Sequence, residues 1–124
     1  MDFLWVGAGG FLGAICRFLV ITWISERVNT SFPLGTFIVN ASGAFVFSLL
    51  AVLVNSMFPF EKELLLLTAT GFLGSYTTFS TFMYETVRLW EDGEVAQGSW
   101  YLLGSGLTGL ALAWAGTLTW IYWL

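Results

Sequence analysis

The feature that most constrains this chain is the spacing of its apolar residues. They fall into four long segments separated by short polar connections, at about residues 3–24, 35–58, 64–90 and 100–124. A helix needs about 20 mostly apolar residues to cross the hydrocarbon of a bilayer. Charged residues make up only 10% of the chain, too few to cover a soluble domain of this size. The sequence therefore predicts an all-α membrane protein, a single domain over residues 1–124 with four transmembrane helices.

The rest of the composition excludes several classes of function. The chain has no histidine, which removes imidazole-based haem, zinc and triad chemistry. Its four basic residues are scattered rather than clustered, which argues against nucleic-acid binding. No nucleophile–base pair or pair of carboxylates can be assembled inside the bilayer. We therefore expect that the protein is not an enzyme and that its function is built within the membrane.

The basic residues give little indication of orientation. With four spans, the first and third connections share one side of the membrane, which carries Arg27 and Arg88, and the other side carries Lys62 and the amino terminus. Lys and Arg residues set the topology of membrane proteins, and two against one is almost no bias. The charge pattern therefore permits insertion in both orientations, although a weak bias or a partner would also serve to orient the chain.

Glycine is frequent in the first, second and fourth segments. Small residues let membrane helices approach one another closely. A bundle of four such helices is also too thin to enclose a pore by itself. We therefore expect a dimer or a larger assembly, while tight packing within one chain would explain some of these glycines equally well.

The third segment carries the strongest functional signal. Residues 71–82 (GFLGSYTTFSTF) place two glycines and five hydroxyl side chains around Thr77, the midpoint of the span. Irregular backbone at this depth is tolerated only where it is buried in protein or lines a cavity. The pattern predicts a helix broken at its centre, where carbonyls can hold a cation and hydroxyls such as Ser80 and Thr81 can solvate an ion. A continuous helix whose hydroxyls bond to the preceding turn is the alternative.

Three further side chains are candidates for contact with an anion. Phe79 and Phe82 are three residues apart and face one way on a helix, and the positive edge of each ring suits an anion that is held weakly. Asn40, inside the second segment, has an amide NH₂ group that can donate to an anion. Ordinary packing is the alternative for the rings, and an interhelical hydrogen bond is the alternative for the amide.

Two charged residues fall inside the expected spans. Arg17 is the only charge deep in the first segment, and it lies about two turns before Ile24. It can therefore reach the interface or bond backbone carbonyls, and we expect a structural or vestibule role rather than direct pore lining. Glu85 lies one turn beyond Phe82 on nearly the same face, so it either lines a vestibule or is a solvated residue near the helix end.

These segments resemble the Fluc (CrcB) fluoride channels along essentially the whole chain. The resemblance rests on residues 9–17 (GGFLGAICR), 33–43 (PLGTFIVNASG) and 71–82, and its specific part is the asparagine motif followed by TTFSTF at this spacing. It implies a passive channel of the cell (inner) membrane that exports cytoplasmic fluoride. It also implies an antiparallel, dual-topology dimer with two pores lined by both subunits, in which some members pair with a paralogue.

The resemblance also implies roles for particular positions. A structural sodium ion at the dimer centre would be held by the backbone carbonyls of Gly74 and Thr77. The positions that correspond to the family's pore and vestibule residues are Asn40, Phe79, Ser80, Thr81, Phe82 and Glu85. One departure is Ser75, which stands where the family often has a second glycine, so that a side chain is present at the expected break.

Two other functions suit a small four-helix membrane protein. A dual-topology multidrug or cation transporter needs a membrane-embedded carboxylate in its first helix, and the only acid there is Asp2, at the terminus. A membrane anchor that docks a soluble partner does not require a polar centre in the third segment. Fluoride conduction is therefore the function that we expect from the sequence.

Overall fold

Helices account for all the regular structure in the part of the chain that the structure, a computed structural model, describes: residues 1–56 and 62–123. Three of them are long, namely α1 (Asp2–Arg27), α2 (Leu34–Ser56) and α6 (Val95–Trp123). The prediction of an all-helical protein is confirmed, and four helical runs fit the four apolar segments of the sequence.

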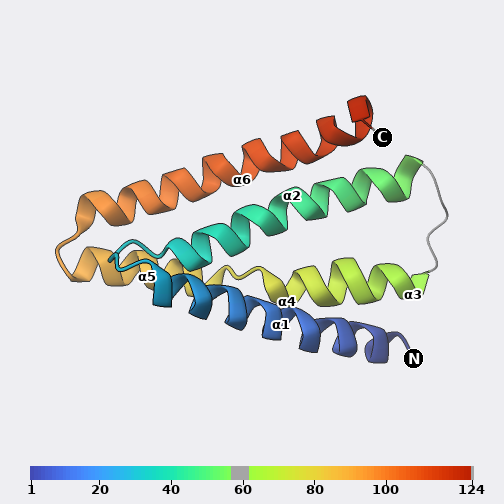
Figure 1. Ribbon diagram of the computed structural model, residues 1–124, viewed down its shortest axis with the longest axis horizontal. Coiled ribbons are helices and arrows are strands. Elements are labelled where there is room, and N and C mark those ends of the chain that lie inside the picture. The colour runs from blue at the N-terminus through green and yellow to red at the C-terminus, as the bar shows by residue number, and fades with distance from the viewer. Residues whose placement is uncertain (57–61, 124) are drawn as a thin grey trace.

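The third apolar segment consists of several shorter elements that follow one another along one line (Figure 1). They are α3 (Lys62–Leu65), the π-helix η1 (Leu66–Leu73), α4 (Gly74–Tyr76) and α5 (Ser80–Glu91). π-helices are rare and are often found at functional sites. The segment therefore differs in its local backbone from the other three.

The surface of the molecule is apolar in the way that lipid contact requires. Asp2–Arg27, Leu34–Val54 and Val95–Trp123 are each long and apolar enough to cross a membrane. Large side chains on the outside of these helices, such as Phe18 and Trp114, are about two-thirds exposed. A soluble protein does not present apolar surface on this scale, and the chain is a multi-pass membrane protein.

The ends of the helices differ from the expected ends by a few residues. α1 continues to Arg27 rather than residue 24, and α6 begins at Val95 rather than about residue 100. Both differences arise because hydropathy detects the apolar part of a helix and not its more polar terminal turns, the last turn of α1 and the first turn of α6. The expected end of the second segment at residue 58, most of the connection at residues 59–63, and residue 124 lie outside the described residues.

Glycine allows the closest contacts between helices. α1 lies against η1 with so little space that a Cβ at Gly9 would lie 2.0 Å from the Leu67 carbonyl oxygen. α2 lies against α6, and a Cβ at Gly116 would lie 2.6 Å from the Phe45 carbonyl oxygen. Some glycines of the sequence therefore serve packing within one chain, as one of the two alternatives above proposed.

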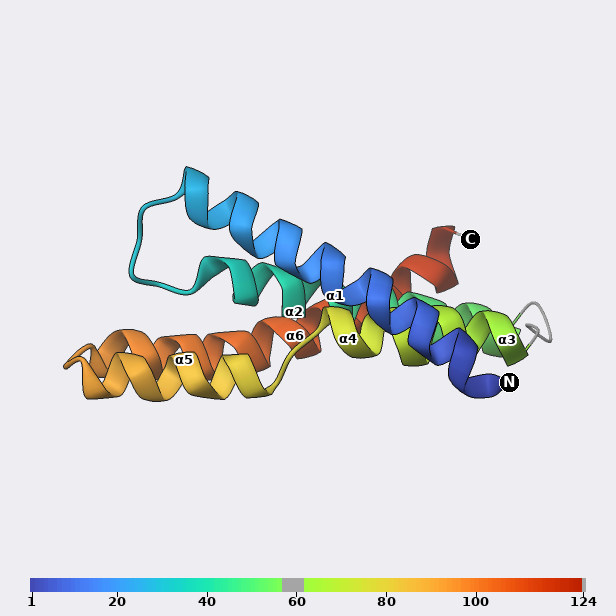
Figure 2. The same cartoon turned by 90° about the horizontal axis from the view of Figure 1, so that it is seen from below.

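The helices run roughly along one direction, and the two ends of the described chain lie at the same end of the bundle in both views (Figures 1 and 2). The connection between α1 and α2 and the turn between α5 and α6 lie at the other end. This arrangement brings the middle of the third segment between α1 on one side and α2 on the other.

Candidate functional site

The site is built around residues 77–79, which lie outside the helices on either side. α4 ends at Tyr76, α5 begins at Ser80, and Thr77 has an extended backbone with φ −79° and ψ 157°. In an uninterrupted helix each amide here would bond the carbonyl four residues earlier. Because buried backbone groups need hydrogen-bond partners, the partners found at these residues show how this backbone is held.

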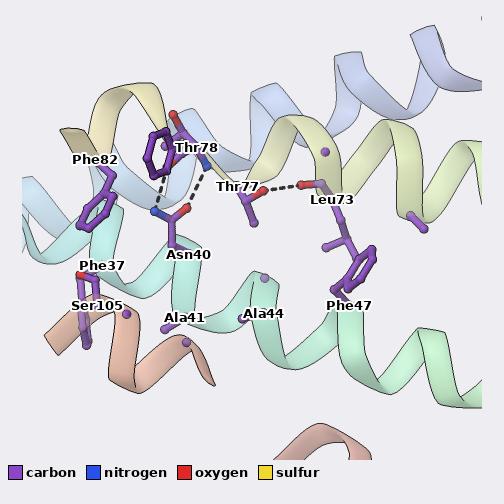
Figure 3. Close-up of a pocket in the computed structure, with 16 residues that line it drawn as sticks. Phe37, Asn40, Ala41, Ala44, Phe47, Leu73, Thr77, Thr78, Phe82 and Ser105 are labelled. Carbon is purple, nitrogen blue, oxygen red and sulfur yellow. Dashed lines mark hydrogen bonds between the residues drawn. The ribbon is translucent and has the colours of Figure 1, made fainter. Parts of the chain in front are cut away.

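Asn40 supplies partners for both backbone groups of Thr78. Its Nδ2 donates to the Thr78 carbonyl oxygen at 2.9 Å, and its Oδ1 accepts from the Thr78 amide at 2.8 Å. Figure 3 shows the amide of Asn40 reaching from α2 to this backbone, with both bonds dashed. Asn40 thus makes the interhelical hydrogen bonds that were the alternative to anion binding, and it keeps one N–H of Nδ2 beyond the bond to Thr78.

Two further contacts complete the partners of this segment. The Thr78 hydroxyl accepts from the Thr81 amide at 3.2 Å, in the manner of an N-cap for α5. Arg17 reaches across from α1 and donates to the Thr77 carbonyl oxygen at 3.5 Å. Arg17 therefore bonds a backbone carbonyl, one of the roles expected for it.

The amide of Thr78 is no longer available to the carbonyl of Gly74, its partner in a continuous helix, because it bonds Asn40 instead. Gly74 is exposed, and a Cβ there would meet nothing closer than 4.0 Å. Ser75, beside it, points toward α1 and donates to the Gly10 carbonyl oxygen at 2.7 Å and to that of Phe72 at 3.2 Å. The side chain of Ser75 therefore ties α4 to α1.

A cavity of about 450 Å³ opens beside this segment, bounded by α2, the third segment and α6 (Figure 3). Five of the residues singled out in the sequence line it: Asn40, Gly74, Thr77, Phe79 and Phe82. α6 contributes Ser105, Gly106 and Gly109. The lining combines amide and hydroxyl groups with aromatic rings, and no charged side chain of the described residues belongs to it, which suits brief contact with a small ion.

The two phenylalanines differ in their surroundings. Their ring centres are 6.1 Å apart in an edge-to-face arrangement. The ring of Phe82 also lies edge-to-face against Tyr101 at 5.0 Å, whereas Phe79 is 75% exposed. Both rings border the cavity, but only Phe82 is supported from behind by α6.

The remaining candidates lie toward the connection between α1 and α2. Glu85 accepts a hydrogen bond from the Thr36 hydroxyl at 2.5 Å, and with Thr36 and Thr81 it lines a second, polar cavity of about 410 Å³. Ser80 is exposed and lines neither cavity. The structure thus divides the candidates between an inner cavity at the interrupted segment and an outer cavity near the end of the bundle.

Two hydroxyl groups of α6 join this site, and the sequence had not assigned them. The oxygens of Tyr101 and Ser105 are buried without a hydrogen-bond partner among the described residues. Tyr101 has no exposed surface, and Ser105 lines the inner cavity. Their spacing of four residues on one face of a mostly apolar helix was the available signal, but the register of α6 against the third segment was needed to interpret it.

The chain resembles known proteins along nearly its whole length. The sequence profile of the family described as "CrcB-like protein, Camphor Resistance (CrcB)" matches residues 4–117. The chain is 50% identical to "Fluoride-specific ion channel FluC 2" of Moorella thermoacetica over 118 residues, 95% of each chain. It is 40% identical to "Fluoride-specific ion channel FluC" of Acidobacterium capsulatum over 94% of this chain and 93% of the relative. A protein of the same name from Chlorobium phaeobacteroides is 45% identical over 91% and 88%.

Proposed function

The chain belongs to the CrcB-like family, and we propose that it is a subunit of a fluoride-selective channel that lets cytoplasmic fluoride leave the cell by passive flow. Relatives that share 40 to 50% of its residues carry the name of that activity. The protein is a membrane transporter rather than an enzyme. Its own residues must therefore supply a path for a small, strongly hydrated anion.

The observation that carries this proposal is the lining of the inner cavity. A narrow path for fluoride must replace the water around the ion with hydrogen-bond donors. The free N–H of Asn40, the hydroxyl of Ser105 and the ring edges of the two phenylalanines are groups of this kind. Within residues 1–56 and 62–123, no Lys or Arg that would hold the anion tightly lines the cavity, so the ion can leave as readily as it binds.

Tyr101 and Ser105 extend the proposed path along α6. Buried hydroxyl groups without partners are uncommon because each costs free energy. Tyr101 lies against Phe82, and Phe82 lines the inner cavity with Ser105. We assign both hydroxyls to contact with the passing anion, between the outer cavity at Glu85 and the inner cavity at Asn40.

A second copy of the chain, inserted in the opposite orientation, would close the path. The inner cavity is open on one side in the single chain, where Phe79 is 75% exposed and Gly74 is exposed. An antiparallel dimer would place the same face of a second subunit there and generate two symmetric paths. A closely related partner chain in place of the second copy would serve the same purpose.

We further propose that the interrupted third segment contributes carbonyls to a structural sodium ion at the dimer centre. Gly74 fits this role because its carbonyl has lost its helical donor and its surface is open. Thr77 fits because its carbonyl lies in the non-helical segment, where only the long bond from Arg17 reaches it among the described residues. Carbonyl oxygens suit a hard cation, and the bound ion would supply positive charge near the anion path.

A dual-topology cation transporter finds less support in the same structure. That function requires a carboxylate within the membrane on the first helix. Asp2, the only acid near that helix's start, forms an ion pair with Lys62 at the end of the bundle. Glu85 is the acid inside the expected third span, and it accepts a hydrogen bond from Thr36.

Efflux of fluoride and of chloride from liposomes that contain only the purified chain tests the function. We expect rapid passive fluoride efflux, strong rejection of chloride, and no need for a proton gradient. Protein-free liposomes are the control. Equal efflux of the two anions, or fluoride efflux that requires a proton gradient, would contradict the proposal.

The orientation of the chain tests the dimer separately. Tags on the native chain in intact cells should be accessible from both sides of the membrane. Two or three lysines added to one connection should bias the chain toward one orientation, because Lys and Arg residues set topology. A native chain found in a single orientation would exclude the antiparallel homodimer and leave pairing with a second, oppositely oriented chain.

A further inference from the structure

A third cavity of about 280 Å³ lies at the end of the bundle that holds the turn between α5 and α6. The polar side chains that line it are Ser31, Tyr84, Glu85, Arg88 and Asp92. Ser31 and Glu85 also line the outer cavity of about 410 Å³, so the two cavities adjoin. This third cavity, which we call the mouth cavity, therefore lies on the outward side of Glu85.

Among the described residues, Arg88 is the one cation that lines the mouth cavity. Its Nη1 donates to the Tyr84 hydroxyl at 3.4 Å, and its Cζ lies 5.9 Å from the centre of the Tyr84 ring. No carboxylate oxygen within residues 1–56 and 62–123 comes within 4 Å of its nitrogens. The guanidinium therefore keeps donors that are not engaged by a carboxylate.

The other cations near the ends of the helices have different surroundings. Lys62 is paired with Asp2 at the opposite end of the bundle. Arg27 belongs to the same end as Arg88, but its guanidinium lies 4.7 Å from the ring centre of Trp23, and it lines none of the three cavities described. Arg27 and Arg88 thus share a side of the membrane and differ in their relation to the proposed path.

The charges around the mouth cavity would disfavour an anion more strongly if Arg88 were neutral. Glu85 and Asp92 both line it with their acidic side chains. A unit charge at about 5 Å in water changes the energy of a second charge by about 0.8 kcal/mol, roughly a factor of four in local concentration at low salt. One guanidinium among these acidic side chains therefore changes the local concentration of a small anion several-fold.

We propose that Arg88 attracts fluoride to the mouth cavity and that Asp92 opposes it, so that this pair sets the rate of fluoride capture at low fluoride concentration. The inference rests on the proposed channel function and adds a site outside the inner cavity. Arg88 acts before the narrow part of the path. Its removal should therefore weaken capture without changing the selectivity that Asn40 and the phenylalanines provide.

The test is fluoride flux through the full-length chain in liposomes, measured as a function of fluoride concentration and of ionic strength. Arg88→Gln should lower flux at low fluoride and low salt by about threefold, with maximal flux at saturating fluoride unchanged. The deficit should shrink below about twofold near 1 M of an inert salt, where the Debye length is about 3 Å. Arg88→Lys should retain most of the flux.

Arg27→Gln is the matched control, because it removes one positive charge from the same side of the membrane and changes the topological bias equally. It should leave the flux at low fluoride unchanged. Asp92→Asn should raise that flux by about twofold, whereas Glu91→Gln, an exposed neighbour that does not line the mouth cavity, should not change it.

Equal flux in Arg88→Gln and the unmodified protein at low salt would overturn the inference, and so would equal losses in Arg88→Gln and Arg27→Gln. A loss that persists at high salt would also overturn it, because a structural effect is not screened. An unmodified protein that passes no fluoride would overturn the proposed function itself, a result that these variants do not mimic.

Discussion

The two sides of the third helical segment differ sharply. On the side of α1, glycines bring the backbones together, and the Ser75 hydroxyl bonds directly to the Gly10 carbonyl. On the side of α2 and α6, the same segment borders a cavity of about 450 Å³, and two nearby hydroxyl groups find no hydrogen-bond partner among the described residues. The first side, which we call the closed side, leaves no room for an ion. The second, the open side, does.

This difference indicates that the two sides of the segment have different roles. The closed side fixes where the helix is interrupted, because α1 holds the residues before residue 77 and Arg17 reaches the Thr77 carbonyl. The open side presents the donors and ring edges that this interruption leaves beside the cavity. Substitutions on the closed side should therefore act on folding, and those on the open side should act on fluoride flux.

The largest effect is expected on the closed side. Gly9→Ala places a Cβ 2.0 Å from the Leu67 carbonyl oxygen, so the backbones must separate, and the folded protein should lose about 3 kcal/mol of stability. Gly7→Ala, in the same helix with nothing within 4 Å, should be neutral or gain up to about 1 kcal/mol. The amount of monodisperse protein and its thermal transition measure both. Equal stability of the Gly9→Ala and Gly7→Ala variants would contradict a distinct close contact on the closed side.

Asn40→Leu should reduce both stability and fluoride flux, because Asn40 bonds to the interrupted segment and also lines the cavity. The Thr78 amide and carbonyl lose their partners, which should cost about 2 kcal/mol of stability. The lost donor should reduce fluoride flux by about tenfold if it contributes about 1.4 kcal/mol to the passage of the ion. Thr119→Val, which removes a hydroxyl bonded within its own helix, is the control. Normal flux in Asn40→Leu would limit this residue to a structural role.

Substitutions of the two phenylalanines should differ in their effect on stability and agree in their effect on fluoride flux. Phe82→Leu removes an aromatic contact with Tyr101 and should cost about 1 kcal/mol, while Phe79→Leu should change stability less because its ring is 75% exposed. Both variants keep apolar bulk and lose the positive ring edge, so both should reduce fluoride flux. Thermal transitions and liposome efflux on the same preparations make the comparison. Unchanged flux in both would assign the rings to packing alone.

The smallest change in stability is expected at Tyr101, where the substitution should not destabilise the protein. Tyr101→Phe removes a buried hydroxyl that has no hydrogen-bond partner in the part of the chain that the structure describes, so the stability should stay constant or rise by up to about 1 kcal/mol. Flux should fall, because the anion loses a donor along α6. Phe82, which contacts the ring of Tyr101, should keep its place in this variant. A loss of stability with normal flux would mean that the hydroxyl is satisfied within the protein.

The sequence predicted the helical class, the number of apolar segments and the residues around Thr77 because each depends on local pattern: the length of apolar runs, and polar residues at mid-membrane depth. It left two alternatives open for Asn40, and the contact with Thr78 required the position of α2 against the third segment. Tyr101 and Ser105 were not assigned because the facing of α6 depends on packing, which is set by Gly116 against α2.

Ser75 and Arg88 illustrate the same limit. A side chain at residue 75 raised the question of whether it would occupy the interrupted segment, and only the position of α1 shows that it turns toward the Gly10 carbonyl. Arg88 was counted in the sequence only as a topological charge. Its place in a cavity depends on the connection between α1 and α2, which is remote in sequence.

Filling the cavity on the open side tests the central claim most directly. Gly109 lines the inner cavity and Gly104 does not, and a Cβ at either meets nothing within 4 Å. Fluoride efflux should be measured from liposomes that contain Gly109→Leu or Gly104→Leu protein, each purified as the same assembly as the unmodified chain. The account predicts that Gly109→Leu blocks most of the fluoride efflux and that Gly104→Leu conducts normally. Normal fluoride efflux through Gly109→Leu would contradict it.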